Sequence, residues 1–312
     1  MPTALITHPA CRAHNPGAGH PESPQRLEAI LRALDAPQFA GLLRHEAPRA
    51  SRESLLTAHS AELVDAILGP LNARAQKEGL VALDPDTLMS PGSAEAALRA
   101  AGAAISAVEE VAARRASNAF CAIRPPGHHA ERARAMGFCL FNNVAIAALY
   151  ARKLGFQRIA IADFDVHHGN GTQEIFWNDP DVLFISTHQM PLYPGSGGAT
   201  ERGASGNILN LPLPAGANGE DLARVYKAFA LPALTTFRPD FLFISAGFDA
   251  HVDDPLAGLA FTERDFAWAT KALCDVAGQT CEGRVVSLLE GGYDLAALAR
   301  SVAAHVQVLM EF

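Results

Sequence analysis

The sequence is poor in cysteine and in charged residues. Only five of its 312 residues are cysteines, and they are scattered and free of any C-x-x-C pair: Cys11, Cys121, Cys139, Cys274 and Cys281. Such a set suits a reducing compartment better than a disulfide-linked secreted fold, so we expect a cytoplasmic protein. A metal site in this chain would have to be built from histidines and carboxylates.

Basic clusters and long apolar runs are absent as well. No apolar run reaches the roughly 18–20 residues of a membrane span. The first residues, MPTALITHPACRAH, do not show the basic stretch followed by an apolar core that is typical of an export signal. The formal net charge is −8, and no block of lysine and arginine resembles a nucleic-acid patch. We therefore expect neither a membrane nor a nucleic acid among the partners.

Apolar residues are plentiful, at 49% of the chain against 19% charged, which is enough for a large core. Short β-branched or aromatic runs alternate with alanine-rich amphipathic stretches, which predicts an α/β fold with a mostly parallel sheet covered by helices on both faces. No repeat or linker interrupts the chain, so we expect a single domain over residues 1–312. The expected strands are Ala4–His8, Ala119–Ile123, Arg158–Ala162, Val182–Ser186, Phe241–Ser245 and Val285–Leu289. The expected helices are Ser93–Arg115, Asn142–Leu154, Gly219–Phe237, Thr262–Gln279 and Leu295–Met310.

Polar, glycine-rich segments follow these strands. They read RPPGHH, DFDVHHGNGT, THQMPLYPGSG, AGFDAHVDD and EGGYD in chain order. Open parallel sheets place their ligand sites at the carboxyl ends of the strands. We therefore expect these histidines and aspartates to converge on one crevice.

The DFDVHH segment carries the residue types of a metal site. If it stays extended, Asp163, Asp165 and His167 point the same way, because strand side chains alternate. An isolated D-x-H is more often a polar loop, but a second acidic turn with Asp253 and Asp254 follows another strand. Three protein ligands with one open position is the arrangement of catalytic rather than structural zinc.

Two further motifs offer catalytic groups. His128 and His129, on a Pro-Gly turn, could hold one neutral and one charged imidazole near reacting atoms. Tyr293 follows two glycines at a strand end and could donate to a developing oxyanion. A serine hydrolase is improbable because no G-x-S-x-G motif is present, and Gly195–Gly198 lacks the lysine of a phosphate-binding loop.

Together RPPGHH, GFCLFNN, DFDVHHGNGT, YPGSG, SAGFDAHVDDPLAGL and LEGGYD resemble the zinc-dependent histone deacetylase family. The likeness is closest to the class II members and the bacterial histone deacetylase-like amidohydrolases, and it runs from about His14 to the C-terminus. The resemblance implies an arginase/deacetylase-like three-layer fold with an eight-stranded parallel sheet. It also implies hydrolysis of acetyl-lysine or similar N-acetyl amides.

The resemblance assigns the metal and its ligands. Asp165, His167 and Asp254 match the ligands of a zinc ion, with Asp254 preferred over its neighbour because it directly precedes a proline. The zinc would lower the pKa of a bound water and polarise the acetyl carbonyl. Because the ligand set is rich in oxygen, ferrous iron is a credible alternative metal.

The resemblance also assigns the catalytic side chains. His129 matches the general base and acid, and His128 its charge-stabilising companion. Asp163 matches the carboxylate behind His128. Asn170 stands behind His129, where class I members carry an aspartate and class II members commonly an asparagine. Tyr293 matches the residue that hydrogen-bonds the scissile carbonyl.

The expected substrate tunnel has Phe138 and Tyr193 as walls and the Gly137 carbonyl as acceptor for the substrate amide. Asp86 resembles a rim aspartate that binds the backbone of lysine substrates. Phe261 stands where polyamine-selective relatives carry an acidic gatekeeper, which favours an uncharged alkyl chain over a polyamine. The alternative for Phe261 is simple packing under its loop.

Structural potassium ions and an exit for acetate are implied as well. Arg26 matches an arginine that lines the exit. The potassium site beside the zinc would use the backbone around Asp163, Asp165, His167 and Thr187 with the Ser186 hydroxyl. A second, weaker site would use Phe176, Asp179 and Val182.

Two rivals remain open. A binuclear manganese ureohydrolase of the same fold would need further bridging carboxylates, where this chain has Asn170 and His168. A catalytically silent acyl-lysine binding module is the second rival. The physiological substrate is not fixed: an acetylated lysine in a protein or peptide, an acetylated polyamine and other small acylated amines all fit. The oligomeric state is open too, with a homo-oligomer as one option.

Overall fold

An eight-stranded parallel sheet forms the centre of the computed structural model, which describes residues 1–312. Its strand order is β2-β1-β5-β10-β9-β6-β7-β8. The strands are β1 (Ala4–Thr7), β2 (Leu43–Glu46), β5 (Asn118–Cys121), β6 (Ile159–Asp163), β7 (Val182–Gln189), β8 (Ile208–Leu213), β9 (Phe241–Ala246) and β10 (Val285–Leu289). The central strands are buried along their whole length, as expected for a sheet that is covered on both faces.

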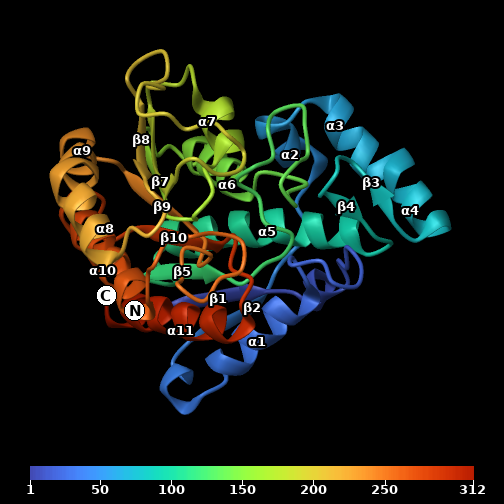
Figure 1. Ribbon diagram of the computed structural model, residues 1–312, viewed down its shortest axis with the longest axis horizontal. Coiled ribbons are helices and arrows are strands. Elements are labelled where there is room, and N and C mark those ends of the chain that lie inside the picture. The colour runs from blue at the N-terminus through green and yellow to red at the C-terminus, as the bar shows by residue number, and fades with distance from the viewer.

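Helices cover both faces of the sheet, so the molecule has three layers (Figure 1). Every helix is too short or too polar to span a lipid bilayer. One apolar core includes residues of α2 (Arg52–Ala58), α3 (Ala61–Ala66), α4 (Asn72–Glu78), α5 (Ser93–Ala112), α6 (Asn143–Lys153) and α7 (Asn170–Phe176). The core on the other face includes residues of α1 (Pro24–Leu34), α8 (Gly219–Val225), α9 (Leu231–Phe237), α10 (Glu263–Thr280) and α11 (Leu295–Glu311).

Two of the long helices, α6 and α11, begin at side chains that cap them. Asn142 accepts from the Ala145 amide at the start of α6, and Asp294 accepts from the Ala297 amide at the start of α11. Such oxygens satisfy backbone donors that have no partner inside a helix. The predicted starts of these helices are therefore correct to within one residue.

The predictions missed the strands at the two edges of the sheet and misjudged one helix. Strand β2 is only four residues long and alternates between half-buried and exposed positions, and β8 contains Pro212. Both features are typical of edge strands and weaken the apolar signal. The helix predicted over Gly219–Phe237 is α8 and α9 joined by a π-helical turn at Tyr226–Ala230. Because Pro232 has no amide hydrogen, the regular helical ladder cannot continue through it.

His305, on α11, is buried in the core without a charged partner. Thr270 already donates its hydroxyl hydrogen to the Phe266 carbonyl at 2.6 Å, so it accepts from His305 Nδ1 at 2.6 Å. Ser287 Oγ lies 2.8 Å from Nε2 and donates to it. Burial lowers the pKa of His305 to about 3, because the charged imidazole would lose its hydration.

This buried imidazole should make the protein acid-sensitive. Its pKa is lower in the folded chain than in the unfolded one, where about 6.5 is usual, so the unfolded chain takes up the proton first as the pH falls. Stability should then fall below about pH 6.5 by up to about 1.4 kcal/mol per pH unit from this residue. We expect His305→Gln to show a shallower fall between pH 6.5 and 4.5 in urea titrations. Equal slopes for the two proteins would contradict this assignment.

Candidate active site

Five adjacent strands supply the site. In the sheet order β5, β10, β9, β6 and β7 are neighbours, and the polar segments predicted from the sequence follow these strands. Their carboxyl ends lie at one edge of the sheet, because the strands are parallel. The predicted convergence of the segments is confirmed.

The DFDVHH segment reaches the site through turns rather than as an extended strand. Strand β6 ends at Asp163, and the Asp163 carboxylate accepts from the Asp165 amide at 3.0 Å. The Asp165 carboxylate in turn accepts from the His167 amide at 2.8 Å. The expectation that strand alternation aligns these side chains is therefore wrong. Aspartate side chains that bond the backbone two residues on bend the chain instead.

His167 has a fixed proton position. Its Nδ1 lies 3.2 Å from Asp165 Oδ1 and 3.1 Å from Asp249 Oδ2. Ionised carboxylates only accept, so Nδ1 carries a proton. Burial opposes the charged form of His167, but Asp165 and Asp249 outweigh it and raise its pKa to about 10. Ligand atoms of these three buried residues lie within 4.8 Å of one another, a grouping that could hold a metal ion.

Asp254 is a second aspartate at this end of β9. Its Oδ2 accepts from the Tyr293 amide at 2.7 Å, and its Oδ1 accepts from the Leu256 amide at 3.0 Å. Burial and the nearby charge of Asp249 raise its pKa to about 7. Asp249 has both oxygens engaged as well, because its Oδ1 accepts from the Val166 amide at 2.9 Å.

The two adjacent histidines differ in their partners. His128 Nδ1 lies 2.9 Å from Asp163 Oδ2, whereas His129 Nδ1 lies 2.7 Å from the neutral Asn170 Oδ1. Burial opposes the charged form of His128, but Asp165 and Asp163 outweigh it and raise its pKa well above the usual value. Burial, with the imidazoles of His128 and His167, lowers the pKa of His129 well below its usual value. The pair thus has the division into one charged and one neutral imidazole that the sequence suggested.

Glu290 fixes the backbone of the turn that carries His128 and His129. Its Oε2 accepts from the amides of Gly127 and His128 at 2.7 and 3.1 Å. It is fully buried, and burial raises its pKa to about 7. The sequence interpretation gave Glu290 no role, although it begins the EGGYD segment. A glutamate that ends a buried strand was the signal that could have identified it.

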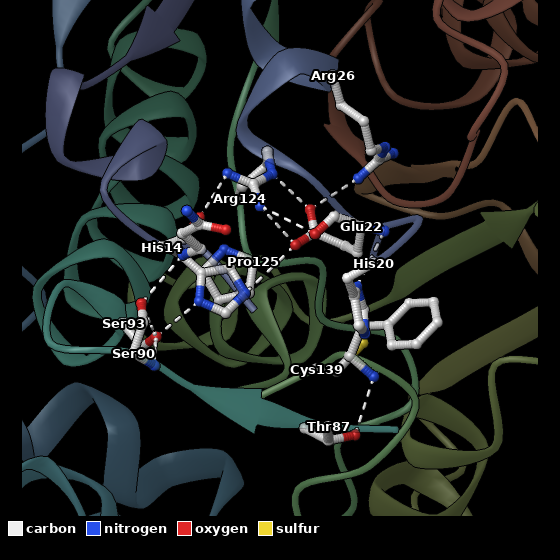
Figure 2. A network of polar contacts seen from close by, with 12 residues as sticks. His14, His20, Glu22, Arg26, Thr87, Ser90, Ser93, Arg124, Pro125 and Cys139 are labelled. Carbon is white, nitrogen blue, oxygen red and sulfur yellow. Dashed lines mark hydrogen bonds and ion pairs between the residues drawn. The ribbon is translucent and has the colours of Figure 1, made fainter. Parts of the chain in front are cut away.

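A buried cluster of charges surrounds Arg124, the first residue of the RPPGHH segment (Figure 2). Arg124 Nη2 donates to Glu22 Oε2 at 2.6 Å, and Arg26 Nη1 donates to Glu22 Oε1 at 3.0 Å. Burial opposes the ionisation of Glu22, but Arg124 outweighs it and holds the pKa of Glu22 well below its usual value. His14 Nε2 approaches the same carboxylate at 3.3 Å. Arg124 and Glu22 are structural members of the site that the sequence did not reveal.

Arg26 braces the segment that carries Tyr293. It donates to the Gly292 carbonyl at 2.6 Å and to the Glu290 carbonyl at 2.5 Å. Its guanidinium lies over the Tyr293 ring, 5.0 Å from the centroid. Arg26, which was predicted to line an acetate exit, therefore packs against Tyr293, the predicted oxyanion donor.

A cavity of about 210 Å³ opens at this edge of the sheet. Its lining includes the predicted Phe138 and Tyr193, together with the imidazoles of His129 and His167 and the phenol of Tyr293. Leu192 and Leu256 were not predicted, since nothing distinguishes them from core leucines in the sequence. The full lining is Asp86, His129, Gly137, Phe138, His167, Leu192, Tyr193, Leu256 and Tyr293.

Asp86 and Phe261 have different surroundings. Asp86 lies in the turn between β3 (Val81–Ala82) and β4 (Leu88–Met89) and lines the cavity. The next residue, Thr87, accepts from the Phe138 amide at 3.0 Å, which ties this turn to the cavity wall. Phe261 is fully buried and packs against Phe266, with ring centroids 6.0 Å apart. The prediction of a substrate-binding role for Phe261 is corrected: it is a core residue beneath its loop.

The two predicted potassium sites also differ. His188 Nε2 lies 3.0 Å from the Gly197 carbonyl, which only accepts, so its Nδ1 accepts from the Ser186 hydroxyl at 2.9 Å. The lone pairs of Ser186 Oγ are thereby left for another partner. At the second site the carbonyls of the three predicted residues converge on one donor, the Asn207 Nδ2 atom. It lies 2.9, 3.1 and 3.1 Å from the carbonyl oxygens of Phe176, Asp179 and Val182. An amide nitrogen carries only two hydrogens and cannot satisfy all three carbonyls, so the second cation site stays a prediction.

Comparison with known proteins decides the family. Residues 20–309 match the histone deacetylase domain family. The chain belongs to the histone deacetylase family. It is 41% identical over 304 residues to a probable deacetylase of Archaeoglobus fulgidus, covering 95% of this chain and 82% of that one. It is 39% identical over 282 residues to a histone deacetylase-like amidohydrolase of Pseudomonas aeruginosa, covering 88% and 73%. The crystal structure of the HDA15 HD domain matches with a TM-score of 0.93 and 36% identity, covering 99% of this chain and 88% of that one.

Membership of this family confirms the resemblance seen in the sequence motifs. It confirms the eight-stranded α/β fold, and it makes the protein a hydrolase of the deacetylase type. Histone deacetylases generally depend on a metal, and a grouping of aspartate and histidine ligands is present.

Gly137 is required at the cavity wall for steric reasons. Its φ of +56° is rare for residues with a side chain, and a Cβ atom there would lie 2.5 Å from the His129 ring. We expect Gly137→Ala to displace that ring and to lower kcat by at least about tenfold, because catalysis is sensitive to misplacement of reacting groups by about 1 Å. Turnover assays with circular dichroism as a folding control test this. A folded Gly137→Ala variant with wild-type kcat would contradict it.

Proposed function

We propose that this histone deacetylase family member is a zinc-dependent enzyme that hydrolyses N-acetyl amides of linear alkylamines, with acetyl-lysine as the first candidate. One observation carries the proposal. The cavity is lined by Phe138 and Tyr193 together with His129, His167 and Tyr293. A cavity that combines apolar side chains with a candidate base, a candidate metal ligand and a hydroxyl donor suits an alkyl chain with a terminal amide.

Asp165, His167 and Asp254 would hold the metal. His167 would release a proton on binding the metal, as histidine ligands do, and the buried carboxylates need a cation nearby. The third ligand is assigned to Asp254 on the family motif, because Asp254 directly precedes Pro255; in the structure the ligand atoms that lie close together are those of Asp165, His167 and Asp249. When bound, zinc lowers the pKa of a water and polarises the acetyl carbonyl. Ferrous iron would suit the same oxygen-rich ligand set.

His129 would act as general base and then as general acid. Its Nδ1 proton is held by Asn170 at 2.7 Å, so Nε2 can accept the proton of the attacking water. The low pKa of His129 keeps it neutral before the reaction. The same nitrogen would then deliver the proton to the leaving amine. His128, paired with Asp163, would remain charged and stabilise the negative charge that develops.

Tyr293 would donate a hydrogen bond to the oxyanion. Desolvation and the charge of Asp249 raise its pKa well above the usual value, so the phenol keeps its proton. Its backbone is fixed by Asp254 on one side and by Arg26 through the Gly292 carbonyl on the other. A preorganised donor of this kind contributes more than one that must reorganise.

Substrate selection would depend on the passage and its rim. The Gly137 carbonyl has only a weak thiol donor, Cys139 Sγ at 3.2 Å, so it can still accept from a substrate amide. Asp86 at the rim could accept from the backbone amides of a lysine peptide. The same carboxylate could also attract the cationic end of an acetylpolyamine, which remains the alternative substrate class. Since Phe261 lies in the core, it offers no basis for choosing between them.

A structural potassium ion beside the divalent metal is part of the proposal. We infer a structural K⁺ on the backbone carbonyls around Asp163, Asp165, His167 and Thr187. The Ser186 hydroxyl supports this, because its hydrogen points to His188 and its lone pairs are free.

A binuclear manganese site is disfavoured, since His168 has both ring nitrogens engaged, with Ser196 at 2.8 Å and Gln173 at 3.0 Å.

The proposal predicts metal-dependent turnover of an acetyl-lysine peptide. The zinc-loaded protein should hydrolyse it, dialysis against a strong chelator should abolish turnover, and added Zn²⁺ should restore it. Tyr293→Phe should keep its zinc but lose about 10²–10³ in kcat, the usual effect of removing one oxyanion donor. Acetylputrescine serves as the comparison substrate, and a clear preference for it would shift the substrate class. Full activity in a verified metal-free sample would refute zinc dependence.

A further inference from the structure

The Asn170 side chain links His129 to an acidic residue, Glu131. Asn170 Oδ1 lies 2.7 Å from His129 Nδ1, and Asn170 Nδ2 donates to Glu131 Oε1 at 2.8 Å. Glu131 is half-buried, and it is not part of the cavity lining.

The orientation of the Asn170 amide determines whether His129 can act as a base. With Oδ1 toward His129, Nδ1 must carry the proton, and Nε2 is free to accept one. A flipped amide would present its NH₂ group to Nδ1 and move the ring proton to Nε2. The two ends of an amide have nearly the same shape, so packing alone does not choose between them. A hydrogen-bonding partner must make the choice.

Glu131 is that partner. An ionised carboxylate only accepts hydrogen bonds, so it stabilises the amide with Nδ2 on its side and repels the oxygen of the flipped form. Met136 Sδ, 3.4 Å from the same Nδ2 atom, is also only an acceptor. A thioether is a weak acceptor, however, so the carboxylate carries most of the preference.

The loop that carries Glu131 is itself fixed by a histidine outside the cavity. His59 Nε2 accepts from the Asn142 amide at 2.8 Å, so its Nδ1 carries the proton and donates to the Glu131 carbonyl at 3.0 Å. The Glu131 amide donates to the Arg134 carbonyl at 2.9 Å. The carboxylate therefore extends from an anchored backbone toward Asn170.

We propose that Glu131 is a positioning residue for the deacetylase reaction: it holds the Asn170 amide in the orientation that keeps His129 Nε2 available as the base. This inference rests on the function proposed above. It goes beyond the family's motifs because it assigns the proton position on His129 to a carboxylate that touches neither the imidazole nor the cavity.

Kinetics on the zinc-loaded protein test the proposal first. A positioned base typically contributes about 10²–10⁴ in rate. In Glu131→Ala, part of the molecules should carry the His129 proton on Nε2 and lack the base, so kcat should fall by about tenfold. KM should change by less than about twofold, since Glu131 does not line the cavity. Glu131→Gln should recover part of the rate, because its side-chain oxygen can still accept from Asn170. Glu174→Ala is the matched control: Glu174 accepts from the Arg132 amide at 2.9 Å in the same loop and should leave kcat unchanged.

A double-mutant cycle separates orientation from simple loop stability. In an Asn170→Asp background the side chain behind His129 has two equivalent oxygens, so there is no orientation left to choose. Removing Glu131 there should cost no activity and should relieve repulsion between two carboxylates. If Glu131→Ala lowers kcat equally in both backgrounds, the residue merely supports the loop and the proposal is wrong.

A second readout does not depend on turnover. Long-range ¹H–¹⁵N spectra of histidine-labelled protein report which ring nitrogen of His129 carries the proton. The wild type should show the proton on Nδ1, and Glu131→Ala should show a measurable fraction on Nε2. An unchanged His129 signal in Glu131→Ala would overturn the proposal. Absence of turnover in the wild type would instead count against the proposed function, and the spectra would still decide the role of Glu131.

Discussion

The site is organised by an excess of buried carboxylates around three imidazoles. Asp163, Asp165, Asp249 and Glu290 are fully buried within one end of the sheet, and Asp254 is nearly so. Burying ionised carboxylates is costly unless they are paired or bind a metal. The charged His128 compensates part of this charge, and backbone amides compensate more. The negative charge that remains uncompensated is the reason for assigning a divalent cation to this end of the sheet.

Each of the three imidazoles has a neighbour that accepts a hydrogen bond from its Nδ1. Asp163 fixes the proton of His128, Asn170 that of His129, and Asp249 that of His167. The Asn170 oxygen lies beside His129 Nδ1 and so leaves Nε2 of that ring free for chemistry. Arg26, which is paired with the buried Glu22, fixes the backbone of the segment that carries Tyr293. The site is thus prepared before substrate binds, which is the general condition for electrostatic catalysis.

Part of this could be predicted from the sequence, and the reasons for the rest are physical. The central strands were predictable because strands buried on both faces are continuous apolar runs. The edge strands β2 and β8 were not, because polar residues and Pro212 interrupt them. Local motifs identified the imidazoles and Tyr293, but Glu290 and Glu131 act through tertiary hydrogen bonds that leave no local pattern. Phe261 was misplaced because a position counted from a motif does not tell which way a side chain points.

Zinc binding to the metal-free protein is the most direct test of the central claim, that the carboxylate excess is balanced by one divalent ion. Zn²⁺ titrated by calorimetry should bind at one equivalent per chain, and saturation should raise the melting temperature, because a ligand that binds only the folded state stabilises it. Asp254→Asn should bind zinc far more weakly while keeping the fold. Absence of binding, a stoichiometry of two, or an Asp254→Asn variant with wild-type affinity would contradict the account.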